Sequence, residues 1–166
     1  MSEITQQQDT RREFVDTLIE LAEKDDRIVV VIPDVGFNYL ERFQERFPNR
    51  FFNTGVTEQA SMAICGGLAL AGLKPYFYTM LNFSVFRPFE MVRNCVALHK
   101  ANVKILGVKG SEKYKFLGFS HNMVFDDEDI YHLEKYLPCY KPQSNMAVRE
   151  ITKITYQNNS PCYIRL

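Results

Sequence analysis

The sequence predicts an α/β fold: a single three-layer α/β/α domain over residues 1–166, built on a mostly parallel sheet. Short β-branched or apolar runs of strand length alternate with longer segments whose apolar residues recur at helical spacing. This alternation is typical of a parallel sheet with helices on both faces. The chain has 166 residues, which suffice for one domain with a substantial core but not for two.

The first elements follow from local signals. Thr10-x-x-Glu13 reads as a capping box, and the apolar residues after it recur at helical spacing until the charged stretch 23–27 ends the helix. Thr54 or Thr57 opens another helix, which Gly72 ends as a C-cap would. The elements expected in this half are a strand over 27–32, a short helix over 39–47, a strand over 50–53 and a helix over 58–71.

The second half continues the alternation. Pro88 is tolerable only in the first turn of the helix expected there, because proline lacks a backbone N–H. The elements expected are a strand over 75–79, a mainly helical segment over 83–100, a strand over 103–108, a long loop over 109–125, a helix over 126–135, a strand over 139–140, a helix over 146–156 and a strand over 162–166.

Ligands of such sheets bind in the crevice beyond the carboxyl ends of the strands. The loops expected at those ends cover residues 33–38, 53–58, 79–86 and 109–125. The residues that carry chemistry should therefore be sought in these four loops.

Composition excludes several classes of function. Lys plus Arg and Asp plus Glu both number 20, and this balance argues against nucleic acid as a main partner. No apolar run approaches the roughly 20 residues that a membrane span needs, and the N-terminus lacks the apolar core of a secretion signal. The four cysteines are scattered without a CxxC pair, which argues against a metal site on this chain and fits a reduced, cytoplasmic protein.

Glu58 is the first candidate for chemistry. It stands at the start of a helix that carries almost no charge, so we expect this helix to be buried all round, with small residues that allow close approach of another backbone. A carboxylate that opens a buried helix is costly unless something pairs with it. The plainer alternative is an acidic residue that the helix dipole favours in the first turn.

Aromatic and titratable residues of the later loops are further candidates. Phe83 and Phe86 could offer their faces to a planar heterocycle, although core packing is the commoner use of a phenylalanine. His121 lies in the long loop, where it could shuttle protons or donate to an oxyanion, or could simply be exposed. Arg11, Lys109 and Lys141 each lie near an element end on the expected ligand side and could hold a phosphate, or be solvated surface charges.

The motifs together resemble the central domain of transketolases, which also occurs in deoxyxylulose-phosphate synthases and in the β chains of 2-oxo-acid dehydrogenases. The resemblance covers nearly the whole chain. It rests on Phe-Asn-Thr-Gly-Val-Thr-Glu-Gln at 52–59 with the Ala/Gly-rich helix after it, on Leu-Asn-Phe-Ser at 81–84, on Gly-Phe-Ser-His-Asn at 118–122, and on the closing 160–166. It implies the pyrimidine-binding fold of enzymes that use thiamine diphosphate.

The resemblance also implies residue roles. Glu58 would hydrogen-bond N1′ of the cofactor's aminopyrimidine, and His121 would assist proton transfers of the substrate; these are the two catalytic residues it implies. Further cofactor contacts would come from Phe83, which would stack on the pyrimidine, and from Phe86, Asp34 and Met80. The positions that match a sugar-phosphate site are Arg11, Asn38, Lys109 and Lys141.

Departures from the family pattern shape the expected assembly. Met80 and Leu117 replace, respectively, an aromatic and an aspartate, which bears on the substrate more than on the cofactor. The Gly-Asp-Gly sequence with which the family holds the diphosphate and its metal does not occur. We therefore expect a split enzyme in which a separate transketolase-like partner subunit holds the diphosphate with Mg²⁺ or Ca²⁺, as a heterotetramer in which the Glu58 helix packs near its symmetry mate.

Three functions remain open at this point. The first is ketol or acyl transfer from a phosphorylated or otherwise anionic substrate. A two-subunit 2-oxo-acid decarboxylase would use Glu58 in the same way. A degenerate, non-catalytic partner domain is the third, but Glu58, Phe83 and His121 occurring together speak against it.

Overall fold

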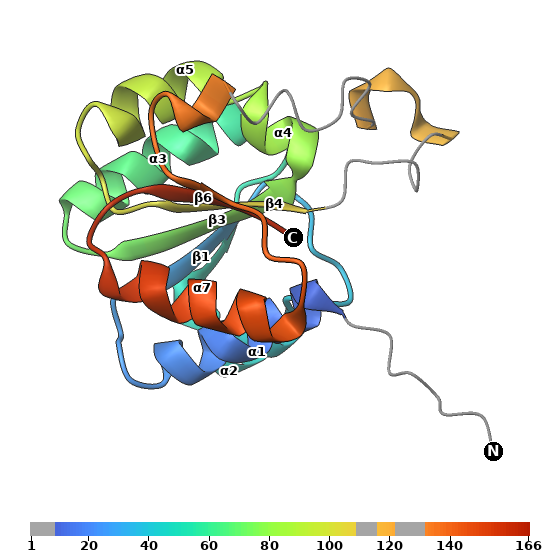
Figure 1. The fold of residues 1–166 in the computed structure, drawn as a ribbon, viewed down its shortest axis with the longest axis vertical. Helices are drawn as coiled ribbons and strands as arrows, with labels where there is room; N and C mark the ends of the chain where they lie inside the picture. The colour runs from blue at the N-terminus through green and yellow to red at the C-terminus, as the bar shows by residue number, and fades with distance from the viewer. Residues whose placement is uncertain (1–8, 109–115, 122–131) are drawn as a thin grey trace.

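The structure is a computed structural model that describes residues 9–108, 116–121 and 132–166. These residues form one six-stranded sheet in the order β2-β1-β3-β4-β6-β5, and every strand pair in it is parallel (Figure 1). The strands are β1 (Ile28–Ile32), β2 (Phe51–Asn53), β3 (Lys74–Met80), β4 (Lys104–Val108), β5 (Cys139–Tyr140) and β6 (Cys162–Arg165). The predicted α/β fold is confirmed.

Helices cover both faces of the sheet and make it the middle of three layers. One face carries α1 (Thr10–Ala22), α2 (Glu41–Arg46) and α7 (Asn145–Gln157). The other carries α3 (Glu58–Leu70), α4 (Leu81–Val85), α5 (Phe89–Met91) and the π-helix η2 (Val92–Ala97). Two short 3-10 helices, η1 (Pro48–Arg50) and η4 (Phe119–His121), lie in the connections.

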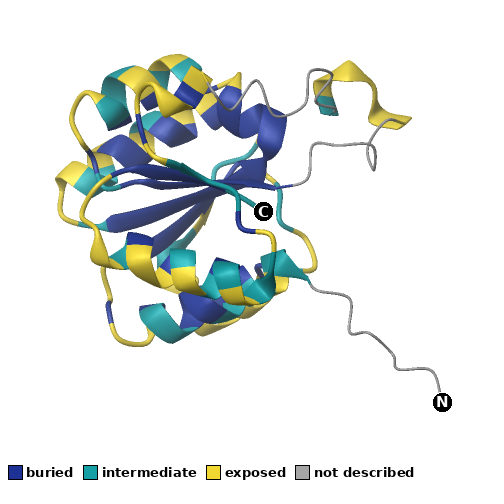
Figure 2. Ribbon diagram, in the orientation of Figure 1, coloured by how far each residue is buried: buried dark blue, intermediate teal, exposed yellow. Residues whose placement is uncertain are grey.

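The core is divided by the sheet into two apolar clusters. β1, β3 and β4 are buried along their whole length, as Figure 2 shows for the centre of the molecule. One cluster joins the sheet to α1 and α7, around Phe14, Leu18 and Tyr78. The other joins it to α3 and η2, around Met62, Phe77 and Val96. Central strands buried on both faces read as continuous apolar runs, which is why the sequence located them.

Small residues of α3 have a use inside the chain. A Cβ on Gly66 would lie 2.9 Å from the backbone oxygen of Cys95, so only glycine lets α3 approach η2 this closely. The expectation that α3 is buried all round is wrong for this chain, because Ile64 and Leu70 are 48% and 62% exposed. The sheet and η2 cover only one side of the helix, and its other side is an apolar surface.

One local expectation is also wrong. The capping box places the N-cap at Thr10, but the N-cap is Asp9, whose carboxylate accepts a hydrogen bond from the Arg12 amide at 3.3 Å. The segment 83–100 is mainly helical, as expected, but it is divided among α4, α5 and η2, since Pro88 takes the N-cap position of α5. The helix expected over 126–135 lies mostly outside the described residues.

None of the helices in the described part of the chain has the length and apolar character that a membrane span requires. All four cysteines are free thiols.

Asp25 ties the loop before β1 to the rest of the domain. Its carboxylate accepts hydrogen bonds at 2.8 Å from both Nε and Nη2 of Arg27, lies 3.2 Å from Nζ of Lys74, and accepts a bond from the Tyr156 hydroxyl at 3.1 Å. The side chain is 8% exposed. Hydrogen bonds from Arg27 hold the pKa of Asp25 well below its usual range, against the opposing effect of burial.

We predict that Asp25→Asn lowers the free energy of unfolding at pH 7 by about 2 kcal/mol, the scale of hydrogen bonds to a charged group. Because the folded pKa is depressed, the ionised carboxylate stabilises the fold above the unfolded pKa of about 3.9, and this contribution is lost as pH falls below that value. Urea denaturation from pH 7 to pH 3 should show the difference between the two proteins shrinking below about pH 4. Asp26→Asn, at a side chain that is 99% exposed, is the control and should change stability little. A constant difference across this range would contradict the account.

Candidate functional site at the carboxyl edge of the sheet

The carboxyl ends of the parallel strands meet at one edge, and the predicted site residues gather there. Asp34 and Asn38 follow β1, Glu58 follows β2, and Phe83 follows β3. His121 comes from the isolated turn η4, which packs against α4. The topology therefore brings together residues that are more than 80 positions apart in the chain.

The turn between β2 and α3 sets the position of Glu58. Thr57 is the N-cap residue, and its hydroxyl donates to the Thr54 carbonyl at 3.0 Å. Ser61 lies 2.6 Å from the Thr54 hydroxyl and donates to the Thr57 carbonyl at 2.7 Å. Gly55 takes a φ of +69°, which glycine adopts without steric cost. These contacts fix Glu58 as the first residue of α3, with its side chain directed inward.

Glu58 is a buried carboxylate with a single cationic partner among the described residues. It is 4% exposed, and the Arg87 guanidinium donates a hydrogen bond from Nη1 to its Oε1. The N-terminus of α3 also favours a negative charge in this position. Burial without a partner would be strongly destabilising, so the ion pair with Arg87 is what permits the carboxylate to lie here in this chain.

Arg87 also covers the ring of Phe83. Its Cζ lies 3.6 Å from the ring centroid, a cation–π geometry, while 37% of the Arg87 side chain remains exposed. Sequence analysis missed Arg87. The signal that could have found it is its spacing, since positions four apart on the helix expected there share one face with Phe83.

His121 is placed against the same phenylalanine. Its ring meets Phe83 edge to face, with centroids 5.0 Å apart and planes at 77°. The Ser120 hydroxyl lies 2.9 Å from Nδ1 of His121, and the Asn82 amide donates to the Ser120 carbonyl. The sequence-predicted residues Glu58, Phe83 and His121 therefore form one cluster, with Arg87 added by the structure.

Asn82 leaves one polar atom unsatisfied beside this cluster. The residue is buried, and its Oδ1 has no hydrogen-bond partner in the described part of the chain. A buried acceptor without a donor is costly. A donor from outside the described residues would satisfy this oxygen.

A hollow of about 350 Å³ lies at the same edge of the sheet, between the loop after β1 and the ends of β3 and β4. Arg11, Asn38 and Met80 are among the residues that line it, so two of the residues predicted for a phosphate share it with Met80, which the sequence assigned to the cofactor. Arg11 donates to the Tyr39 hydroxyl and stacks over its ring with Cζ 3.9 Å from the centroid. Asn38 has a φ of +69°, and its backbone N–H donates a hydrogen bond to the Glu41 carboxylate at 2.7 Å. The guanidinium is thus held in a fixed orientation at the wall of the hollow.

Asp34 is positioned by a residue that sequence analysis did not single out for this purpose. Asn53 accepts hydrogen bonds from the amides of Asp34 at 3.1 Å and Gly55 at 3.0 Å, and donates to the Asp34 carboxylate at 3.2 Å. Asp34 has a φ of +55°. Asn53 therefore joins the loop after β1 to the loop that precedes Glu58.

The remaining predicted residues are not part of these contacts. Phe86 lies at the surface and is 54% exposed. Lys141 follows β5 at the far edge of the sheet and does not line the hollow beside Arg11. Lys109 lies outside the described residues.

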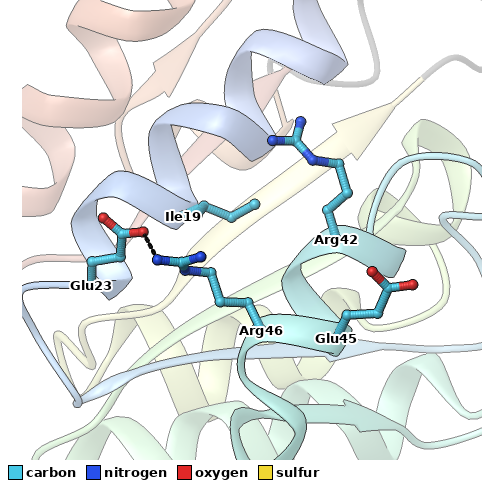
Figure 3. Close-up of a pocket in the computed structure, with 5 residues that line it drawn as sticks. All are labelled: Ile19, Glu23, Arg42, Glu45 and Arg46. Carbon is cyan, nitrogen blue, oxygen red and sulfur yellow. Dashed lines mark ion pairs between the residues drawn. The ribbon is translucent and has the colours of Figure 1, made fainter.

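A larger hollow, of about 450 Å³, lies elsewhere in the described part of the chain. Figure 3 shows it between α1 and α2, lined by Ile19, Glu23, Arg42, Glu45 and Arg46. Arg46 pairs with Glu23 across it, and Arg42 pairs with Asp16. Because its charges neutralise one another at an exposed surface, the smaller hollow at the strand ends is the better candidate for ligand binding.

The cluster suits a planar, nitrogen-bearing ring. Glu58 supplies a buried hydrogen-bonding carboxyl group, Phe83 supplies a flat face, and Arg87 already shows that a planar N–H donor fits between them. No group of three or more His, Cys, Asp or Glu side chains that could hold a metal ion occurs in the described ranges.

Comparisons with known proteins show the family of this chain. The family model "Transketolase, pyrimidine binding domain" matches residues 6–166. The chain is 35% identical over 163 residues to one subunit of the apulose-4-phosphate transketolase of Phocaeicola vulgatus, covering 94% of this chain and 50% of that protein. It is 31% identical over 157 residues to the putative transketolase C-terminal section of Methanocaldococcus jannaschii, covering 94% and 49%.

A solved structure has the same fold. It is that of a split gene transketolase in the form of an inactive β4 tetramer; its TM-score is 0.81 at 32% identity, and the match covers 95% of this chain and 50% of that one. The chain thus spans about half the length of the relatives that it matches.

We predict that Asn53→Ala loosens the loop after β1 without unfolding the domain. Loss of hydrogen bonds worth about 1 kcal/mol each should speed exchange of the Asp34 and Gly55 amide protons by about fivefold or more. Hydrogen exchange followed by NMR would measure the two exchange rates. Asn94→Ala, in η2 and away from this loop, is the control. Unchanged protection of both amides would show that Asn53 does not hold the loop.

Proposed function

This chain belongs to the transketolase pyrimidine-binding domain family, and on that premise we propose that it supplies the aminopyrimidine-binding, cofactor-activating half of a thiamine-diphosphate site. The observation that carries the proposal is the buried Glu58 carboxyl group beside the face of Phe83. The site would serve ketol or acyl transfer by a split, transketolase-like enzyme.

Each residue of the cluster has a defined task in this proposal. Glu58 would hydrogen-bond the ring nitrogen N1′, and Phe83 would stack on the pyrimidine. The bound cofactor would supply a carbanion that adds to a substrate carbonyl. His121, held by Ser120 beside Phe83, would transfer protons to and from substrate oxygens. Met80 would line the substrate side of the site, together with Arg11.

A partner subunit would complete the cofactor site. We propose that it binds the diphosphate together with Mg²⁺ or Ca²⁺, because those ions need a set of oxygen ligands. The relative from P. vulgatus is named as one subunit of its enzyme, and the matching solved structure is that of a split gene product. Exposed apolar side chains on loops at this edge, among them Phe37, Val56, Phe86 and Phe119, would be covered by the partner.

Self-association would complete a heterotetramer. The exposed apolar side of α3, with Ile64 and Leu70, lies away from its buried face and would pack against a second copy. These two apolar surfaces would thus serve two different interfaces.

The substrate would be anionic or phosphorylated. Arg11 lines the hollow at the same edge of the sheet, and a guanidinium matches phosphate geometry in a bidentate way. The names of two relatives, the apulose-4-phosphate transketolase and a 1-deoxy-D-xylulose-5-phosphate synthase, refer to phosphorylated sugars. We therefore favour transfer over simple decarboxylation, while Asp34, Asn38, Lys109 and Lys141 stay proposed contacts of cofactor or substrate.

We predict that Glu58→Gln lowers turnover about 10²–10⁴-fold, the usual contribution of acid–base catalysis, in the complex reconstituted with the diphosphate-binding partner. Assembly, measured by analytical ultracentrifugation, should be unchanged. Glu45→Gln, at an exposed carboxylate of α2, is the matched control. Activity that survives the Glu58 change would contradict the proposal and favour a non-catalytic partner domain.

We predict that Arg11→Met raises the KM for a ketose phosphate by about 10–100-fold, the loss expected for a hydrogen bond to a charged group. The KM for the corresponding ketose without phosphate should change little. Arg12→Met, the exposed neighbour on α1, should leave both values unchanged. An equal effect on both substrates would show that Arg11 supports the fold of the hollow rather than recognising phosphate.

A further inference from the structure

The side chain of Arg87 lies where the proposed cofactor ring would lie. In the chain by itself, the guanidinium covers the face of Phe83 and hydrogen-bonds the Glu58 carboxylate. We propose that Arg87 is a displaceable stand-in for the aminopyrimidine, which keeps Glu58 paired in the free chain and must leave its place when the cofactor enters. The proposal rests on the proposed function and deepens it.

Chemical similarity makes the exchange plausible. A guanidinium and an aminopyrimidine are both flat, delocalised groups that stack on an aromatic face and offer N–H donors to a carboxylate. Glu58 and Phe83 would make the same two kinds of contact with either group. Since both groups cannot occupy one slot, the contacts of Arg87 compete directly with those of the ring.

The need for a stand-in comes from the burial of Glu58. A carboxylate that is 4% exposed has no access to bulk water, and Arg87 is its only charged partner among the described residues. Removing one partner of a buried ion pair leaves an uncompensated charge. The free chain can therefore hold this carboxylate ready for a ligand only if something else pairs with it meanwhile.

The position of Arg87 allows it to leave. It stands in the exposed break between α4 and α5, directly before Pro88, and more than a third of its side chain faces solvent. Because this part of the side chain already faces solvent, a change of rotamer would carry the guanidinium outward. The displaced guanidinium would then lie at the mouth of the site, in water.

The proposal has an unusual consequence for a single substitution. Arg87→Met removes the competitor and should tighten binding of a pyrimidine, because apparent affinity is proportional to the fraction of molecules in which the slot is open. The same substitution leaves Glu58 unpaired and should lower the melting temperature of the free chain. If Arg87 had only a structural role, its substitution would weaken pyrimidine binding and also lower the melting temperature.

The test uses the whole chain without a partner and 4-amino-2-methylpyrimidine as the probe, titrated by NMR. We expect Arg87→Met to bind the probe about tenfold more tightly than the native chain, which corresponds to about 1.4 kcal/mol, with shifts of the Phe83 and His121 ring protons. Arg93→Met, at an exposed arginine of η2 that pairs with Asn94, is the matched control and should bind as the native chain does. Glu58→Gln should abolish binding.

The outcomes separate the two proposals. Equal or weaker binding by Arg87→Met, with binding still dependent on Glu58, overturns the stand-in and leaves the pyrimidine site intact. Binding that is indifferent to Glu58, or absent from every variant, overturns both. If Arg87→Met does not fold, Arg87→Lys replaces it, since an ammonium can pair with Glu58 but cannot stack as a plane; a smaller gain of about threefold is then expected, and no gain contradicts the proposal.

Discussion

Burial of the Glu58 carboxylate is the constraint on which the arrangement of this edge depends. The group is placed at the first turn of α3 by a turn that Gly55, Thr57 and Ser61 hold together. Once it is buried, it requires a donor of hydrogen bonds, and the segment after β3 supplies one in Arg87. Phe83 then gives the donor a flat surface, and the His121 ring packs edge to face against the same phenylalanine.

The parallel sheet makes this convergence possible. All six strands end at one edge, so loops from distant parts of the chain meet there without any strand having to reverse. Asn53 adds a direct link between two of these loops. The cluster around Glu58 includes Phe83 of α4, whereas Arg11, held by Tyr39, lines the hollow between the loop after β1 and the ends of β3 and β4. Further apolar side chains are exposed around this edge and along α3, which is the surface expected of a protein that works in an assembly.

The sequence by itself determined the alternation of strands and helices, the buried central strands and the identity of Glu58, Phe83 and His121 as candidates. These follow from patterns that act over a few residues: apolar periodicity, small residues in a helix and the short motifs around each candidate. The position of the first N-cap was misjudged, because neighbouring residues compete for such a place and local pattern does not rank them.

Only the tertiary structure decided which side chains meet. Arg87 reads in sequence as an ordinary charge beside a proline, and its role appears only when α3 and α4 bring Glu58 and Phe83 within reach of it. Met80, which the sequence assigned to the cofactor, is the last residue of β3 and lines the same hollow as Arg11. Contacts between these side chains depend on distances between segments that are far apart in the chain. No local pattern encodes those distances.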